Sequence, residues 1–232
     1  MNLALFDLDH TLIPFDSGMA WTRFLVGTGV LAPQANHDYL AYCQQYVAGT
    51  LDIHAMHRAC VAPLLRFPRP LLALWGREFE LALAPQVPAA MLALVRRHQD
   101  AGDLCAIVTA TTRFIAEPLA RLFSVAHLVA TEPATVDGAP TAALTGEIAG
   151  LPCFSQYKPT RVANWLANLP AGLLPGSGPA PNTLVSFKKS WFYSDSASDL
   201  PLLRCVSNPV AVRPDARLRA IAQQSGWPII ES

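Results

Sequence analysis

Short apolar runs alternate along this chain with segments of helical periodicity. Residues 3–6, 104–108, 128–130 and 191–194 are brief apolar runs, as expected of strands buried on both faces of a sheet. Between the second and third runs, apolar residues recur at helical steps. A strand, a helix and a further strand in this order predict the βαβ unit of a parallel sheet, and residues 206–212 suggest one more strand.

A long helical segment separates the first apolar run from the second. Over residues 17–83, apolar positions recur every three or four residues, which predicts several consecutive helices. Residues 89–99 show the same spacing, and a further helix is expected to begin near Lys158. Residues 131–154 favour hairpin-like extended structure, and the Pro- and Gly-rich residues 170–181 predict an exposed loop.

The charge balance excludes one broad class of function. The chain has 232 residues, with 17 Lys and Arg against 17 Asp and Glu, so its formal net charge is zero. A nucleic-acid-binding protein needs an excess of basic residues to neutralise phosphates, so we expect no nucleic-acid partner. The hydrophobic share of 52% is enough for a full core.

Neither a membrane segment nor a secretion signal is predicted. Pro, Gly or charged residues interrupt every apolar stretch before it reaches the roughly 18 residues of a membrane-spanning helix. The chain reaches Asp7 before a signal sequence could form. The five cysteines lack CxxC spacing, which favours reduced thiols over disulfides or a zinc site. We therefore expect a cytoplasmic protein, and these patterns do not predict its oligomeric state.

A pair of carboxylates, Asp7 and Asp9, follows the first apolar run within the segment Asp7-Leu8-Asp9-His10-Thr11. Two carboxylates at positions i and i+2 of a turn that leaves a strand can both face the crevice where open α/β folds bind ligands. One could attack a substrate while the other transfers a proton. Asp and Thr are also common in turns and helix caps, so a structural role stays open.

A second acidic pair, Asp195 and Asp199, follows the apolar run that ends at Ser194. Carboxylates four residues apart at the start of a helix point to one side, which suits a hard cation such as Mg²⁺. Capping of that helix is the alternative. Thr109, at the end of another strand, could bind an anion, and Lys158 could neutralise a phosphoryl group. The alternatives for these two are a helix cap and a solvated lysine.

These groups are expected to converge on one site. Because the carboxyl ends of parallel strands meet at one edge of a sheet, residues far apart in the chain come together there. The set then contains a nucleophile, a proton carrier, a metal-binding site and groups that stabilise phosphate charge. Together they suit phosphoryl transfer.

The same residues resemble the four ordered motifs of the haloacid dehalogenase (HAD) superfamily. The motifs match residues 7–11, Thr109 at its strand end, Lys158, and residues 194–201. The helical insertion after the first motif resembles a C1 cap. The details are similar to subfamily IB, which contains the phosphoserine phosphatases.

The resemblance implies both a fold and an activity. The fold is α/β, a three-layer Rossmann-like HAD core with a parallel sheet, formed by residues 1–16 and 85–232. Residues 17–84 would form the inserted helical C1 cap. The activity is that of a Mg²⁺-dependent phosphomonoesterase that forms an aspartyl-phosphate intermediate and hydrolyses a small phosphorylated metabolite.

The resemblance also assigns roles to single residues. Asp7 is implied as the nucleophile, and Asp9 as the group that protonates the leaving alkoxide and then deprotonates water. Lys158 is implied to offset the charge of Asp7. The implied phosphate-binding residues are Thr109, Ala110 and Lys158. The implied metal cluster consists of Asp7, Asp9 through its backbone carbonyl, Asp195 and Asp199.

Two further residues are candidates for binding the substrate. Asp16 stands where phosphoserine phosphatases carry a Glu that holds the substrate ammonium, so the resemblance implies an amine-bearing substrate such as phosphoserine or histidinol phosphate. With Ser17, Asp16 could instead cap the following helix. Arg58 could pair with a substrate carboxylate, although most helix arginines are solvated. Residues 109–112 replace the Ser-Gly-Gly-Phe of the phosphoserine phosphatases, which argues against phosphoserine itself.

Two alternatives use a similar residue set. A signalling receiver domain also combines an acceptor Asp, a Thr, a Lys and Mg²⁺, but it is shorter and its acceptor follows an inner strand. A non-catalytic binding module on the same scaffold is the other alternative. The presence of every expected catalytic side chain argues against it.

Overall fold

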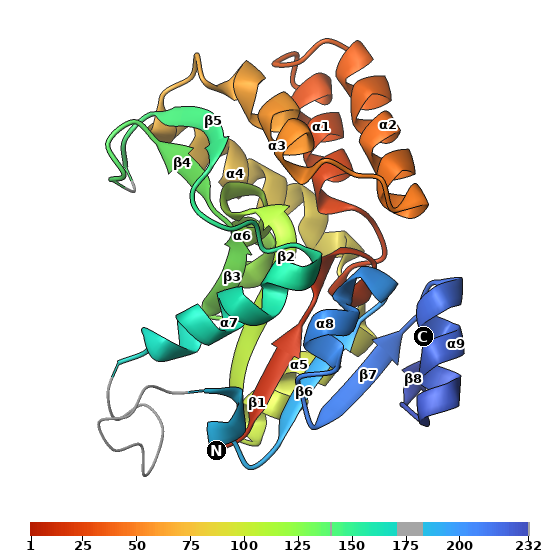
Figure 1. Cartoon of the computed structure of the whole chain (residues 1–232). Helices are drawn as coiled ribbons and strands as arrows, with labels where there is room; N and C mark the ends of the chain where they lie inside the picture. The colour runs from red at the N-terminus through yellow and green to blue at the C-terminus, as the bar shows by residue number, and fades with distance from the viewer. Residues whose placement is uncertain (140, 171–182, 232) are drawn as a thin grey trace.

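The computed structural model describes residues 1–139, 141–170 and 183–231, and a six-stranded parallel sheet lies at its centre (Figure 1). The strand order is β3-β2-β1-β6-β7-β8, and every neighbouring pair is parallel. The chain reverses its direction of winding at β1, so a ligand crevice is expected at the carboxyl end of this strand. The strands are β1 (Leu3–Phe6), β2 (Leu104–Thr112), β3 (His127–Thr131), β6 (Ser190–Ser194), β7 (Asn208–Val212) and β8 (Ile229–Ile230).

Helices cover both faces of this sheet. Because successive side chains of a strand point to opposite faces, Phe6 packs in one buried cluster and Leu5 in the other. Helices α5 (Ala89–Asp100) and α6 (Arg113–Leu122) bury their apolar residues in the cluster that contains Phe6. The opposite face packs against α7 (Lys158–Ala167), α8 (Leu200–Leu203) and α9 (Ala216–Ser225). The predicted α/β fold with a parallel sheet is thereby confirmed as a three-layer arrangement.

Four helices between β1 and α5 form what we call the α1–α4 unit. Figure 1 places them together beyond the end of the sheet at which β1 ends. The buried Trp21 ring packs edge-on against Phe79 within the unit and against Phe114 of α6. The predicted helices of residues 17–83 are present. The four helices are α1 (Ser17–Gly27), α2 (Gln34–Ala48), α3 (Ile53–Val61) and α4 (Arg69–Leu83).

A separate antiparallel hairpin lies beside the α1–α4 unit. Its strands are β4 (Pro133–Thr135) and β5 (Leu144–Ile148), in the region where the sequence predicted extended structure. Figure 1 shows the hairpin next to α3. The buried His57 of α3 contacts the Glu147 carbonyl oxygen through Nε2 at 3.1 Å.

The observed elements differ from the prediction in two places. Strand β2 does not stop at Thr109 but continues to Thr112, which pairs with Thr131 after a shift in register. The β-branched threonines favour extended backbone, and the irregularity lets the strand continue past its first polar residue. Helix α9 and strand β8 were not predicted. The Pro- and Gly-rich loop expected over residues 170–181 falls, except for Pro170, outside the described residues.

Within residues 1–139, 141–170 and 183–231, no single helix is both long and apolar enough to cross a membrane. Residues 69–86 and 89–100 together have the length and composition of a membrane-spanning segment, but the two parts are bent by 105° relative to each other.

Candidate active site

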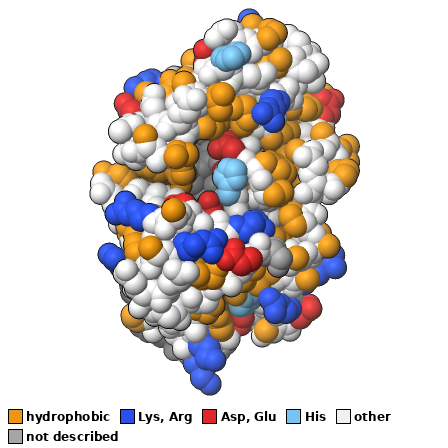
Figure 2. Space-filling view, turned by 90° about the vertical axis from the view of Figure 1, so that its right-hand side faces the viewer, with side chains coloured by type: hydrophobic (Ala, Val, Ile, Leu, Met, Phe, Trp, Pro, Cys, Tyr) orange, Lys and Arg blue, Asp and Glu red, His pale blue; other side chains and the backbone are white. Residues whose placement is uncertain are grey.

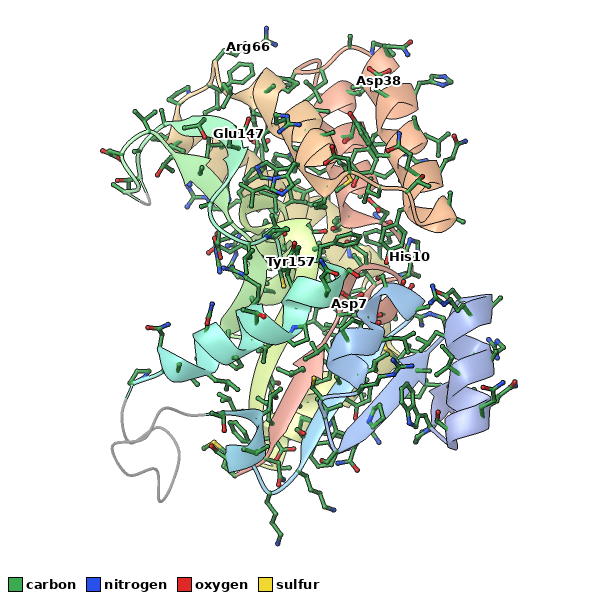
Figure 3. The ribbon with its side chains drawn as sticks, viewed as in Figure 1. Asp7, His10, Asp38, Arg66, Glu147 and Tyr157 are labelled. Carbon is green, nitrogen blue, oxygen red and sulfur yellow. The ribbon has the colours of Figure 1, made fainter. Side chains whose placement is uncertain are left out.

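Asp7 lies at the carboxyl end of β1, where the sheet meets the α1–α4 unit, and His10 lies beside it (Figure 3). The tight turn of residues 8–12 follows, and His10 adopts a left-handed backbone conformation with φ of 57°. The Arg213 guanidinium, in the loop after β7, donates to the carbonyl oxygens of His10 at 2.9 Å and Thr11 at 2.7 Å. The turn of residues 8–12 is therefore held by Arg213, a residue more than 200 positions later in the chain.

Lys158, the first residue of α7, links two carboxylates. Its Nζ donates to Asp7 Oδ1 and to Asp199 Oδ2, both at 2.8 Å, and Ser194 also donates to Asp199 Oδ2 at 2.8 Å. Burial lowers the pKa of Lys158, but the Asp199 and Asp7 carboxylates outweigh it and hold this pKa well above its usual value. The cluster therefore has a permanent cation at its centre.

Thr11 connects the two acidic loops. Its hydroxyl lies 3.3 Å from Asp7 Oδ2 and 3.0 Å from Asp195 Oδ1, and it accepts the Asp195 backbone N–H at 3.0 Å. One hydroxyl has one proton and cannot donate fully to both carboxylates. Burial and then repulsion from Asp7 raise the pKa of Asp195 to about 8. Asp7 and Asp195 therefore lie close together, and among the described residues the Lys158 ammonium pairs with Asp7 and Asp199 but not with Asp195.

The same residues fit a divalent cation. The buried Asp199 Oδ1 has no hydrogen-bond partner among the described residues, and Asp195 carries the unfavourable charge just described. In the described part of the chain, no three His, Cys, Asp or Glu side chains form a ligand cluster. Mg²⁺ is usually held by only one or two carboxylates together with water, so this finding is compatible with the predicted donor set.

Asp9 is held by hydrogen bonds at both carboxylate oxygens. Oδ1 accepts the Ser17 backbone N–H and Oδ2 accepts the Thr111 hydroxyl, both at 2.7 Å. Burial and then repulsion from Asp16 raise the pKa of Asp9 to about 7. A carboxyl group with such a pKa can hold or release a proton near neutral pH, as a general acid and base must.

Thr109 and Ala110 lie on the lining of the cavity above Asp7, as does Lys158. The Thr109 hydroxyl is buried and accepts the Thr111 backbone N–H at 3.1 Å, so its own proton can still be donated. The structure thus brings together the three residues that the sequence predicted as phosphate-binding.

A cavity of about 730 Å³ covers this group of residues. Figure 2 shows the surface hollowed at this position, with acidic and histidine side chains inside the hollow and apolar side chains around it. Asp7, Asp9, Asp195 and Asp199 all contribute to the lining on the side of the sheet. The lining from the α1–α4 unit includes Tyr39, Tyr42, Cys43, Tyr46 and Met56. A small organic molecule fits such a space.

Tyr46 of α2 crosses from the α1–α4 unit to the second acidic loop. Its hydroxyl donates to Ser196 Oγ at 2.8 Å and lies 2.9 Å from Ser198 Oγ. Because Ser196 directly follows Asp195, a side chain of the helical unit contacts the loop that carries two of the predicted metal ligands. Tyr46, Ser196 and Ser198 all belong to the cavity lining.

Asp16 has the structural role that the sequence left open, and it also faces the cavity. Its Oδ1 accepts the Met19 backbone N–H at 2.7 Å and caps α1. Asp16 also belongs to the cavity lining. Capping uses one carboxylate oxygen, so the negative charge is still available to a ligand.

Arg58 lies apart from the other predicted site residues. Its guanidinium pairs with Glu147 of β5 at 3.3 Å, both side chains are about half exposed, and Arg58 is not part of the cavity lining. Figure 3 shows Glu147 well away from Asp7. The geometry therefore gives no support to the prediction that Arg58 binds substrate. The neighbouring His57 lies 3.0 Å from Thr112 Oγ1 through Nδ1, which fits packing and not metal binding.

Several residues that organise the site were not predicted. Thr11 lies inside the first motif and Thr111 lies two residues after Thr109, so the sequence indicated their neighbourhood but not their contacts. Asp215 precedes a helix and caps it, but it also accepts the Ala197 backbone N–H at 2.7 Å and so holds the second acidic loop. Nothing in the sequence pattern indicates the contact of Arg213 with the first loop, because its partners are backbone carbonyls.

Comparison with known proteins agrees with this geometry. A family model of haloacid dehalogenase-like hydrolases matches residues 4–204. The chain is 38% identical over 232 residues to the histidinol-phosphatase of Neisseria meningitidis serogroup C (strain 8013), covering 99% of this chain and 98% of that relative. It is 29% identical over 236 residues to a phosphoserine phosphatase of Mycobacterium tuberculosis (strain ATCC 25618 / H37Rv), covering 97% of this chain and 69% of that relative.

Solved structures share the fold. A protein with unknown function from Bordetella pertussis Tohama I superposes with a TM-score of 0.85 at 40% sequence identity, covering 99% of this chain and 97% of that one. A substrate-bound phosphoserine phosphatase superposes with a TM-score of 0.62 at 16% identity, covering 100% and 93%. The chain belongs to the haloacid dehalogenase-like hydrolases. Within that family it is a phosphatase.

Proposed function

We propose that this protein is a Mg²⁺-dependent phosphomonoesterase that hydrolyses a small, amine-bearing phosphate ester through an aspartyl-phosphate on Asp7. The observation that carries the proposal is the position of Asp7, whose two oxygens meet the Lys158 ammonium and the Thr11 hydroxyl at the base of the cavity. A carboxylate held in this way is oriented to attack.

The chemistry divides between two carboxyl groups. An Asp7 oxygen attacks the phosphorus atom, and the bond between phosphorus and the ester oxygen breaks while Asp9 gives its proton to the leaving alkoxide. Water then attacks the phosphorus atom of the aspartyl-phosphate, and Asp9 takes the proton. Inorganic phosphate leaves and Asp7 is restored, so one acid and one nucleophile serve both halves of the reaction.

The remaining residues stabilise charge. Thr109 and Lys158 would bind oxygens of the transferring phosphoryl group, with the backbone N–H groups near Ala110 close by. Asp7, Asp195 and the Asp9 carbonyl would hold Mg²⁺, and Asp199 orients Lys158 beside them. When bound, Mg²⁺ would neutralise this acidic cluster and polarise a phosphoryl oxygen.

The cavity lining favours one kind of substrate. Asp16 supplies a negative charge to which an ammonium group can bind, and the tyrosines of α2 offer aromatic surface. Arg58, the predicted partner of a substrate carboxylate, pairs with Glu147 and does not belong to the cavity lining. We therefore favour an amino alcohol phosphate such as histidinol phosphate over phosphoserine. The name of the relative with 38% identity points in the same direction.

A panel of phosphate esters assayed for kcat/KM tests this proposal. The panel contains histidinol phosphate, phosphoserine, phosphoethanolamine, glycerol phosphate and p-nitrophenyl phosphate, each with Mg²⁺ and each with excess EDTA. We expect hydrolysis only with Mg²⁺, and the highest kcat/KM for an amine-bearing ester. Equal rates in EDTA would exclude the metal role, and equal kcat/KM for amine-bearing and amine-free alkyl esters would exclude the substrate class.

A further inference from the structure

The two oxygens of the Asp9 carboxyl group have chemically different partners. Oδ1 accepts a backbone N–H, that of Ser17, whereas Oδ2 meets a hydroxyl, that of Thr111. A backbone N–H can only donate a hydrogen bond, but a hydroxyl can both donate and accept. The oxygen that faces the N–H therefore stays the acceptor, and the proton of the acid form belongs on Oδ2.

Thr111 has a second partner that makes this arrangement work in both halves of the reaction. Its Oγ1 also lies 3.1 Å from the buried Ser17 Oγ. When Asp9 is a carboxylate, the Thr111 hydroxyl donates to Oδ2. When Asp9 carries a proton and no ester is bound, the same hydroxyl turns its own proton toward Ser17 and accepts at Oγ1. As the Asp9 proton passes to the leaving-group oxygen, the Thr111 hydroxyl turns back and donates to Oδ2. The Asp9 carboxyl group therefore has an ordered hydrogen-bond partner in both protonation states.

The strand end places Thr111 where this role is possible. Residues i and i+2 of a strand lie on the same face, and Thr109 and Thr111 both line the cavity. The Thr111 backbone N–H donates to Thr109 Oγ1 at 3.1 Å, so the two side chains hold a fixed relation. The register of β2 against β3 shifts between Val108 and Thr112, which frees this segment from regular pairing.

We propose that Thr111 is the positioning residue of the acid and base Asp9, and that its hydroxyl aims Oδ2 at the leaving-group oxygen of the substrate. This inference rests on the proposed function, and it adds a residue that acts through Asp9 without touching the phosphoryl group. A valine at position 111 keeps the shape of the side chain but removes the hydroxyl. A serine keeps the hydroxyl.

The leaving group supplies a readout that a purely structural role would not change. An alkoxide needs a proton as it departs, whereas p-nitrophenolate departs readily without one, so loss of the acid slows alkyl esters selectively. Because kcat/KM reports only the steps up to aspartyl-phosphate formation, it isolates this proton transfer from the later attack of water. The measured quantity is the ratio of kcat/KM for the best alkyl ester of the panel to that for p-nitrophenyl phosphate.

We expect Thr111→Val to lower this ratio by about tenfold or more, and Thr111→Ser to keep it within about threefold of the unchanged protein. Asp9→Asn lowers the ratio as well, and the double variant Asp9→Asn with Thr111→Val falls no further, because both changes remove the same proton transfer. Thr22→Val is the matched control. Among the described residues, the buried threonine hydroxyl that it removes donates only to the Gly18 carbonyl oxygen in α1, so the ratio should stay unchanged.

Three outcomes would overturn the role of Thr111, and a fourth would overturn the proposed function. An equal loss of kcat/KM for both esters in Thr111→Val, with circular dichroism showing a folded protein, would make Thr111 structural and overturn the inference. No loss of kcat/KM for either ester in Thr111→Val would overturn it too. A fall of the ratio in Thr111→Ser as large as in Thr111→Val would have the same consequence. If the unchanged protein hydrolyses neither ester with Mg²⁺, the proposed function itself fails, and the role of Thr111 fails with it.

Discussion

The two sides of the cavity are built in different ways. On the side of the sheet, charged groups are buried and paired with one another, with Lys158 only 3% exposed and Asp199 2%. On the side of the α1–α4 unit, the lining is made of phenol rings and apolar groups, and Tyr46 is 39% exposed. Reaction chemistry needs charges fixed in a dry environment, whereas recognition of a small molecule needs shape and a few polar contacts.

This contrast suggests that the sheet side determines which reaction occurs and the helical side determines which substrate is accepted. Asp16 and Tyr46 stand at the boundary. Asp16 caps a helix of the unit while its charge reaches the cavity, and Tyr46 binds the loop that carries Asp195. Substitutions on the two sides should therefore differ in kind: loss of turnover or stability on one side, and altered selectivity on the other.

The largest effect is expected for Asp7→Asn on the sheet side. The amide lacks the nucleophilic carboxylate, so kcat should fall by at least about a thousandfold for every ester. Lys158 keeps its second carboxylate partner, Asp199, so the fold should survive. Steady-state kinetics together with circular dichroism check this, and an unimpaired kcat would assign the nucleophile to another residue.

A large effect on stability is expected for Lys158→Met. The change removes the cation that neutralises two buried carboxylates, and breaking a buried ion pair costs about 3–5 kcal/mol of unfolding free energy. Urea unfolding without Mg²⁺ measures this loss. Arg219→Met, which breaks an exposed pair with Glu231, is the control and should leave the unfolding free energy almost unchanged. Similar losses in the two variants would contradict the importance of burial.

On the helical side, Asp16→Asn should raise KM selectively for amine-bearing esters, and the loss of its repulsion should also lower the pKa of Asp9. Asparagine caps helices about as well as aspartate, so α1 should keep its stability while the charge is lost. We expect KM to rise about tenfold for amine-bearing esters, the cost of one charge contact, and to stay unchanged for p-nitrophenyl phosphate. A uniform rise in KM for all esters would show that Asp16 acts only through the helix.

The smallest effect concerns pH and the contact between α3 and the rest of the molecule. Burial lowers the pKa of His57 below its ordinary value of 6.5. As the pH falls below 6.5, the unfolded chain therefore takes up a proton on His57 before the folded protein does. The stability contributed by neutral His57 is complete above pH 6.5 and is lost progressively as the pH falls through the pKa of the folded state. The urea midpoint should drop further between about pH 7.5 and about pH 5.5 in the unchanged protein than in His57→Gln. An equal drop would show that His57 does not contribute.

Much of the sheet side was predictable because its signals are local. An apolar run followed by a carboxylate indicates a buried strand that ends at a crevice, and this pattern identified Asp7 and Asp195. The helical insertion was also predictable, because periodicity over residues 17–83 is a property of neighbouring positions. Arg58 shows the limit of such reasoning: its position on a helix did not reveal that Glu147, 89 residues away, would be its partner.

The sequence by itself predicted which side chains would carry the chemistry and determined on which elements they stand, because periodicity and strand ends depend on adjacent residues. Tertiary structure alone decided how those side chains are held. Thr111 reaches Asp9 across 102 residues, Tyr46 reaches Ser196 across 150, and Arg213 reaches His10 across 203. Such contacts depend on how the strands are ordered in the sheet and on where the α1–α4 unit packs, and no local pattern records either.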